Sequence, residues 1–390
     1  MRILVAPDKF KHALTSRQAA RAIADGIRDA DPTIDVDLCP MADGGEGTGE
    51  LLAAALHAMP QTRMVRDPLA RSRRAQWWWS PTRRLAIVEL AQAAGHSLLT
   101  PDEYAPFHAS TYGVGELIVA AREAGAHELF VALGGSATVD GGAGLLQALG
   151  WRLFDVTGRE MPAGVGGGAL ARVSQILPAG DSSPMRVTAL VDVQNPLIGP
   201  RGAAMVFGPQ KGASPSEARE LDEGLRNWCE VLQKSSSRRD LNPGTAGFGA
   251  AGGVAVALRA AFDATIRSGF ETLSTHVGLD DRLAACDLCL TGEGRLDVQT
   301  AGGKVVSGLA RRAKTEHRQV VAFVGQVARG DGAGEEDWLG QFGLRDCVEI
   351  TPPGYDLKSA LADTEMNLRI AVGRWISQEL RSNSRSESPI

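Results

Sequence analysis

Short apolar runs alternate with longer amphipathic segments along most of the chain. The apolar runs are typical of buried strands, and they are Ile3–Ala6, Ile34–Leu38, Ala86–Leu90, Leu129–Leu133, Val187–Val191, Leu288–Leu290 and Val320–Val324. The amphipathic segments predict helices at Thr15–Asp29, Glu46–His57, Gly113–Ala124, Gly142–Leu149, Pro215–Gln233, Gly252–Phe262, Gly303–Lys314 and Asp356–Leu380. Strands that alternate with helices of about ten to fifteen residues predict an α/β fold with parallel sheet.

Three loops combine glycines with carboxylates or hydroxyl groups. They are Ala42–Thr48 (ADGGEGT), Gly134–Gly144 (GGSATVDGGAG) and Thr291–Lys304 (TGEGRLDVQTAGGK). Glycine lets backbone N–H groups approach an anion closely, and carboxylates are the ligands that Mg²⁺ prefers. Each loop lies where a helix is expected to begin, so the three together favour a phosphate and metal site over ordinary turns.

Composition limits the classes of function. The chain has 390 residues, enough for two hydrophobic cores, and its net charge of −5 argues against a broad nucleic-acid surface. No apolar run reaches the roughly 18 residues of a membrane span, and the start MRILVAPDKFKHAL is unlike a signal peptide. We therefore expect a cytoplasmic protein that binds small molecules.

The five cysteines favour buried thiols over a metal site. Cys286 and Cys289 form the one CxxC, and no second CxxC stands at zinc spacing. Cys289 also falls within an apolar run, which predicts a buried strand.

No GxxxxGK[ST] loop and no protein-kinase motif set is present, so a nucleotide-dependent function needs another family. Seven segments, in conserved order, resemble the bacterial type I glycerate kinases from Met1 to about Trp375. They are APDKFK, MADGGEGT, TYGVGELI, GGSATVDGGAG, DVQNPLIGPRGAAMVFGPQKGA, GFGAAGGVA and TGEGRLDVQTAGGK.

The resemblance implies ATP-dependent phosphorylation of D-glycerate, in this family usually at the 2-hydroxyl, with Mg²⁺. It also implies two α/β domains with the active site in the cleft between them. One is a discontinuous Rossmann-like domain of residues 1–68 and 283–380, and the other is an inserted domain of residues 69–282. The polar residues 381–390 are expected to be a disordered tail.

Phosphoryl transfer needs positioning and charge neutralisation, which indicates roles for the matched residues. The expected catalytic groups are Asp192, Asp43, Lys11 and Asp8, with Asp192 the first choice for base or metal ligand and Glu293 a second metal ligand. Substrate and phosphate contacts are expected from Lys9, Gly44, Gly45, Glu46, Gly134, Gly135, Ser136, Thr138, Asn195, Lys211, Gly292, Glu293, Gly294, Asp297, Thr300 and Lys304. Any one lysine is equally typical of a solvated surface charge.

The chain departs from the family pattern at three places. Ala13 replaces a small hydroxyl residue, Val139 replaces an asparagine, and Glu103–His108 lacks an Arg-Asn-Pro sequence. These departures leave open a kinase for another small hydroxy acid, such as tartronate or a longer sugar acid. A non-catalytic ligand-binding relative is the second alternative, and a homodimer is compatible with the sequence.

Overall fold

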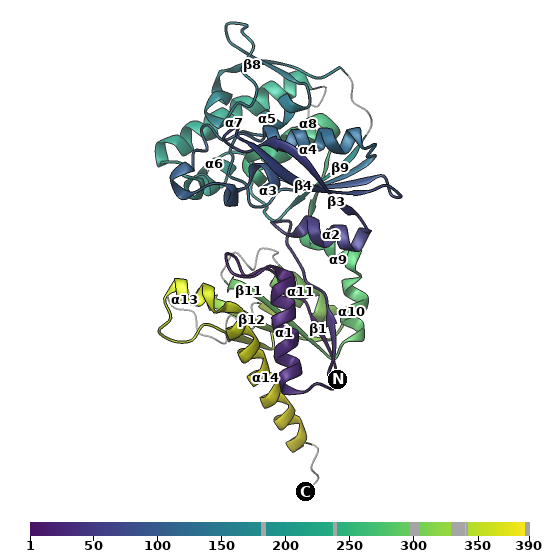
Figure 1. The fold of residues 1–390 in the computed structure, drawn as a ribbon. Coiled ribbons are helices and arrows are strands. Elements are labelled where there is room, and N and C mark those ends of the chain that lie inside the picture. Colours follow the sequence, from purple (N-terminus) through teal and green to yellow (C-terminus); the bar gives the residue numbers. More distant parts are fainter. Residues whose placement is uncertain (181–184, 237–239, 297–304, 329–339, 341, 387–390) are drawn as a thin grey trace. The chain divides into compact units, whose positions relative to one another are not determined.

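The computed structural model describes residues 1–180, 185–236, 240–296, 305–328, 340 and 342–386. The chain divides into two compact units (Figure 1). Unit 1 comprises Met1–Asp43 and Leu273–Ile390, and unit 2 comprises Gly44–Thr272. The sequence analysis placed these boundaries after residues 68 and 282. No helix in the described part of the chain is both long and apolar enough to cross a membrane.

Unit 1 is built on a parallel sheet. Its described strands are β1 (Arg2–Val5), β2 (Asp35–Leu38), β11 (Leu288–Leu296), β12 (Gln319–Val327) and β13 (Asp346–Glu349). They lie in the order β13-β12-β11-β1-β2, and every neighbouring pair is parallel. Together with the parallel strands of unit 2, this confirms the predicted α/β class.

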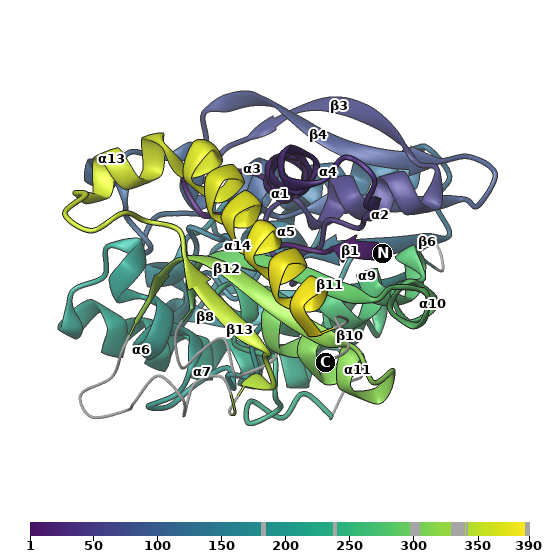
Figure 2. The same ribbon diagram turned by 90° about the horizontal axis from the view of Figure 1, so that it is seen from below.

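Helices cover both faces of the unit 1 sheet. They are α1 (Ser16–Ala30), α10 (Leu279–Ala285), α11 (Val305–Thr315), α13 (Leu357–Ala362) and α14 (Thr364–Ser386). Figure 2 shows α1 and α14 on one face and α11 on the other. The α1 and α14 side packs Ile23, Ile27 and Val372 against Val5 and Phe323 of the sheet. Helix α1 begins as predicted, with a capping box between Thr15 and Gln18.

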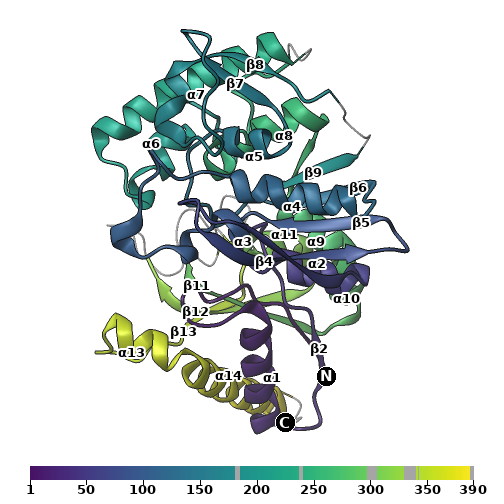
Figure 3. The same ribbon diagram turned by 45° about the horizontal axis from the view of Figure 1, so that its top comes forward.

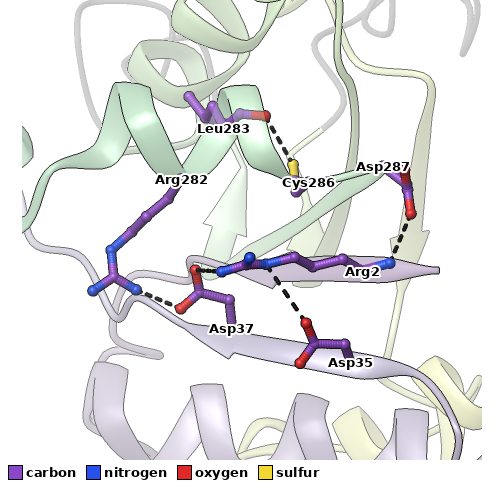
Figure 4. Close-up of polar contacts among 7 residues, drawn as sticks. All are labelled: Arg2, Asp35, Asp37, Arg282, Leu283, Cys286 and Asp287. Atoms are coloured by element: carbon purple, nitrogen blue, oxygen red, sulfur yellow. Dashed lines mark hydrogen bonds and ion pairs between the residues drawn. The ribbon is translucent and has the colours of Figure 1, made fainter.

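Ion pairs join segments near the amino ends of the unit 1 strands (Figure 4). Asp37 of β2 accepts from Arg2 Nη2 at 3.2 Å and also binds Arg282 of α10. The Arg2 backbone N–H donates to Asp287 Oδ2 at 2.7 Å, and the Cys286 thiol donates to the Leu283 carbonyl at 3.2 Å. Arg2 begins β1 and Asp287 directly precedes β11, whereas Asp37 pairs with Leu4 further along the strands.

The CxxC cysteines are buried. Cys286 is 1% exposed and Cys289, in β11, is fully buried. Burial raises the pKa of both thiols, so both stay protonated and unreactive near neutral pH.

Unit 2 contains a larger, mixed sheet. Its described strands lie in the order β10-β9-β6-β5-β4-β3, parallel from β10 to β5 and antiparallel in the β5-β4-β3 meander. Their bounds are β3 (Met59–Arg66), β4 (Ser72–Ser80), β5 (Leu85–Glu89), β6 (Glu128–Ala132), β9 (Arg186–Val191) and β10 (Thr265–Ser268). A separate hairpin pairs β7 (Arg152–Asp155) with β8 (Val173–Leu177).

The unit 2 sheet is also covered on both faces. Its helices are α2 (Thr48–Leu56), α3 (Ala91–Ala94), α4 (Tyr112–Glu123), α5 (Ala143–Ala148), α6 (Ala203–Phe207), α7 (Pro215–Ser235) and α8 (Val254–Phe262), and α9 (Gly269–Val277) leads out of the unit. Figure 3 shows α4, α5 and α8 on one face and α2 on the other. Alternate strand residues such as Val88, Val131 and Ala189 enter the large core under α4, α5 and α8.

The last helix differs from the one predicted at Asp356–Leu380. It is interrupted at Asp363, which ends α13, and α14 begins at Thr364. Helix α14 continues to Ser386, past the predicted end at Leu380, and the disorder expected for residues 381–390 stays a prediction. Packing against α1 fixes the earlier turns, and adding further turns to an existing helix costs little.

The Arg/Pro-rich segment Arg66–Arg74, whose composition is also typical of a domain boundary, contains the end of β3, a turn and the start of β4. Asp67 holds this turn by accepting from the backbone N–H groups of Leu69 and Arg71, both at 2.9 Å. The segment therefore lies within unit 2.

Candidate active site

Three of the predicted acidic residues lie at one edge of the unit 1 sheet. Asp8 follows β1, Asp43 follows β2 and Glu293 lies in β11, and these strands are parallel neighbours. The register places Val5 opposite Leu290, so Asp8 and Glu293 extend equally far beyond that pair. Both are buried, at 5% and 6% exposed. The carboxyl ends of the strands are where ligands bind in such sheets.

Burial raises the pKa of Asp8 well above its ordinary value. The negative charge of Asp43 acts in the same direction, as does that of Glu293 more weakly, whereas Lys9 lowers the pKa. The Lys9 backbone N–H also donates to Asp8 Oδ1 at 2.7 Å. A raised pKa makes Asp8 a stronger base, which is the property needed to accept a proton from a hydroxyl group.

Two of the family motifs meet in unit 1. The Asp8 backbone N–H donates to the Gly292 carbonyl at 2.9 Å, and the Thr291 hydroxyl donates to the Ala6 carbonyl at 2.8 Å. A Cβ on Gly294 would lie 3.1 Å from the Lys11 backbone nitrogen. The APDKFK and TGEG segments are thus side by side, and the Lys11 side chain is exposed.

The remaining predicted residues of the C-terminal loop, Asp297, Thr300 and Lys304, lie outside the described residues. The two expected metal ligands fall in different units, Asp192 in unit 2 and Glu293 in unit 1. Among the residues that the structure describes, no three His, Cys, Asp or Glu side chains form a metal-binding group. Carboxylate oxygens are of the type that suits Mg²⁺, which commonly takes one or two oxygens from a protein and the rest from phosphates and water.

In unit 2, the loops Ala42–Thr48 and Gly134–Gly144 contact each other. The Gly134 N–H donates to the Gly44 carbonyl at 3.1 Å, and a Cβ at residue 134 would lie 2.2 Å from the Gly45 Cα. Only glycine permits this approach of two backbones. Glu46, in the first of these loops, is exposed, and Gly135, in the second, is exposed and has φ of 75°.

Lys211 lies at the centre of the second group of predicted residues. Its side chain is buried, at 4% exposed, and its Nζ donates to Ser136 Oγ at 2.6 Å and to the Thr138 carbonyl at 2.8 Å. Burial lowers the pKa of this amine to about 7, although the charges of Asp140 and Asp192 raise it. Lys211 is therefore no solvated surface charge.

The Thr138 hydroxyl is buried and has no hydrogen-bond partner within the described residues. Buried polar atoms are nearly always hydrogen-bonded, so an unpartnered hydroxyl beside a buried amine indicates a place for a ligand or water oxygen. A cation, a hydroxyl and glycine-rich backbone together can receive an anion such as phosphate or carboxylate. Asp192 directly follows β9, and its charge acts on Lys211.

Asn195 has a structural contact, since its Nδ2 donates to the Arg201 carbonyl at 2.8 Å. It therefore holds the turn that follows Asp192.

Two buried acids that support these loops were missed from the sequence. Asp140 is fully buried, and its Oδ2 accepts from the Thr111 N–H at 2.8 Å and from the Thr111 hydroxyl at 2.7 Å. Glu89, at the end of β5, accepts from the Gly47 and Gly49 N–H groups at 2.9 and 2.6 Å. A signal for Glu89 was present, because one charged residue in the apolar run LAIVEL predicts a buried charge with a partner.

Comparison with known proteins identifies the family of the chain. The family model described as the glycerate kinase family matches residues 3–378. The chain belongs to the glycerate kinase family. This confirms the resemblance found in the sequence and makes the protein a kinase.

Relatives and a solved structure extend the match to nearly the whole chain. A glycerate 2-kinase of Escherichia coli (strain K12) is 39% identical over 330 residues, covering 84% of this chain and 86% of the relative. A glycerate kinase of Bacillus subtilis (strain 168) is 39% identical over 365 residues, covering 92% and 93%. A crystal structure assigned as glycerate kinase 2 from Salmonella typhimurium LT2 has a TM-score of 0.79 at 34% identity and covers 98% of this chain and 99% of its own.

Proposed function

We propose that this glycerate kinase family member transfers a phosphoryl group from ATP to D-glycerate, with Mg²⁺, and forms 2-phospho-D-glycerate. The names of its relatives support the substrate, and one names the 2-kinase activity. The observation that carries the proposal is Lys211, a buried amine held between Ser136 and Thr138 in a glycine-rich loop. A buried amine whose printed partners are a hydroxyl and a backbone carbonyl is suited to an anionic ligand.

Two kinds of group take part in this proposal. Lys211, with the Ser136 and Thr138 hydroxyls, would bind an anionic oxygen of the substrate or of the transferring phosphate. Asp8, whose pKa burial raises, and Asp192 are the candidate acceptors of the glycerate hydroxyl proton. Removal of that proton makes the oxygen a better nucleophile toward the phosphate.

Mg²⁺ would neutralise phosphate charge, and its proposed protein ligands are Asp192 and Glu293. Lys9 and Lys11 are proposed to contribute further positive charge. A cytoplasmic location and a homodimer also stay predictions.

The experiment is a coupled ADP-release assay of the purified chain with ATP and Mg²⁺ over a panel of hydroxy acids. The panel contains D-glycerate, L-glycerate, tartronate and a longer sugar acid, with no acceptor as the control for ATP hydrolysis. Phosphorus NMR of the product identifies the phosphorylated hydroxyl. We expect the highest kcat/KM with D-glycerate, a 2-phosphate product and loss of turnover in EDTA.

Each part of the proposal has its own contradicting result. A 3-phosphate product would refute the position, and a preference for tartronate or a sugar acid would refute the substrate. Turnover that persists without divalent metal would refute the role of Mg²⁺. Absence of turnover with every acceptor would refute the proposed activity.

A further inference from the structure

A histidine outside the sequence-predicted site connects the two segments that meet at Lys211. His96 is half-buried in the short turn His96–Leu98 after α3. Its Nε2 lies 2.9 Å from the carbonyl oxygen of Gln210, the residue before Lys211. Its Nδ1 lies 3.0 Å from the Tyr104 hydroxyl, and the two rings are 4.0 Å apart between centroids.

The chemistry of these partners defines the direction of both hydrogen bonds. A backbone carbonyl can only accept, so His96 Nε2 carries a hydrogen and donates it to Gln210. In the neutral ring Nδ1 is then an acceptor, and Tyr104 donates its hydroxyl hydrogen to it. The Gln210 carbonyl therefore fixes the ring tautomer, and Tyr104, by donating to Nδ1, helps to hold the ring in the orientation that reaches this carbonyl.

The backbone of the same histidine holds the other segment. The His96 N–H donates to the Gly135 carbonyl at 2.8 Å, and the Ala137 N–H donates to the Ala94 carbonyl at 2.9 Å. Gly95 forms an isolated antiparallel bridge with Ser136. These contacts place Ser136, the hydroxyl partner of Lys211, directly on the chain that carries His96.

The contacts therefore connect Lys211, Ser136 and His96 in a closed ring. Lys211 Nζ binds Ser136, the Ser136 loop binds the backbone at Gly95 and His96, and the His96 ring binds Gln210 beside Lys211. Tyr104 also supports the turn that follows Lys211. Gly212 has φ of +97°, and a Cβ there would lie 2.7 Å from the Tyr104 carbonyl oxygen.

We propose that His96, oriented by Tyr104, is a positioning residue that fixes the Lys211 backbone relative to Ser136. This inference rests on the proposed function, in which Lys211 binds an anionic oxygen of a reacting molecule. The lysine side chain is long and flexible, so its amine is placed accurately only if its Cα and its hydroxyl partner are both held. A displacement of about 1 Å in such a group can reduce the rate by up to about 10²-fold.

The test compares His96→Leu, which removes both ring contacts, with His96→Gln, whose amide can still donate to the Gln210 carbonyl. We expect His96→Leu to lower kcat/KM roughly tenfold, within the range for misplaced groups, and His96→Gln to recover most of the loss. His127→Leu is the matched control, because His127 is an exposed histidine of the same unit. It should keep wild-type activity.

Comparison with Lys211→Met separates positioning from general support of the fold. A residue that acts through Lys211 must change the same parameter, kcat or KM for the same substrate, as Lys211→Met does. In the Lys211→Met background, His96→Leu should then have little further effect. An equal loss from His96→Leu in both backgrounds, or a loss that His96→Gln does not recover, would overturn the proposal.

Hydrogen exchange provides a readout that needs no turnover. We expect His96→Leu, but not His127→Leu, to speed amide exchange in the peptide Gly208–Ala213 severalfold or more. Unchanged exchange in that peptide would refute the positioning role. If His96→Leu speeds exchange in that peptide but the wild-type protein phosphorylates no acceptor, the His96 bridge exists and the proposed function is wrong.

Discussion

The buried amine of Lys211 leads to a prediction about stability as well as activity. Its pKa is lowered from 10.5 to about 7, chiefly because burial removes water from the charged form. In the unfolded chain the same amine titrates near its ordinary value. Lys211→Met removes the titrating group while keeping a long, unbranched side chain in its place.

The sign of the effect follows from proton binding. Between about pH 7 and pH 10.5 the unfolded chain binds more protons at Lys211 than the folded chain does, so stability rises with pH in this window. Below about pH 7 the amine is charged in both states, and its destabilising effect is complete. Above about pH 10.5 it is neutral in both, and the effect disappears.

The difference between the two pKa values corresponds to a destabilisation of the folded state on the order of 5 kcal/mol, since one pKa unit equals about 1.4 kcal/mol. Roughly 3 kcal/mol of this is expected between pH 7 and pH 10. Met leaves the Ser136 hydroxyl and the Thr138 carbonyl without their donor, which costs about 1–3 kcal/mol at every pH. Lys211→Met should therefore be more stable than wild type at pH 7, on the order of 2 kcal/mol, and slightly less stable at pH 10.

Urea unfolding at pH 7, 8, 9 and 10, followed by tryptophan fluorescence, measures this difference. Five of the seven tryptophans lie in unit 2, which contains Lys211, so the signal reports mainly on that unit. Lys234→Met is the matched control, because Lys234 is exposed near the end of α7. Its stability should follow the wild-type pH profile. Parallel profiles for wild type and Lys211→Met would show that the folded amine titrates near its ordinary pKa and would refute the reasoning.

The remaining predictions concern the acids and the cysteines. Asp192→Asn should lower kcat by roughly 10²-fold, the scale of lost proton transfer or charge stabilisation, without changing the unfolding midpoint. Asp356→Asn is its control, because Asn caps a helix about as well as Asp, and steady-state turnover should match wild type. If both variants turn over equally, Asp192 is a turn residue. Replacing Cys286 and Cys289 together by Ala should change kcat by no more than a few-fold relative to wild type, and neither purified protein should contain stoichiometric zinc. Zinc that is bound by the wild type and lost in the variant would contradict the interpretation of these residues as buried thiols.

The fold was largely predictable because its signals are local. Apolar runs such as Val187–Val191 and the capping box at Thr15 depend on near neighbours, and both match observed elements. The gathering of Asp8, Asp43 and Glu293 was predictable for a different reason. Parallel strands have their carboxyl ends at one edge, so the strand order brings the residues that follow β1 and β2 close to the second half of β11.

Residues that act through tertiary contacts were not predictable in the same way. His96 is separated from Gln210 by more than a hundred residues, and nothing in its own segment indicates that contact. The β3–β4 turn was ambiguous in the sequence, because an Arg/Pro-rich composition suits a domain linker and a hairpin turn equally well. The break at Asp363 was missed because the helical pattern of the sequence continues across it.

Asp140 shows how much of the site depends on groups that touch no reacting atom. Burial raises the pKa of its carboxyl group, while hydrogen bonds from Thr111, Gly142 and Gly144 oppose that rise and favour the charged form. The same charge raises the pKa of Lys211 and so favours the protonated amine that an anion requires. One buried carboxylate therefore holds the start of α4 against the Gly134–Gly144 loop and also supports the charge of Lys211. An interpretation of that loop as a backbone cradle alone omits the carboxylate that favours the charged form of Lys211, the cation that we propose to bind an anion.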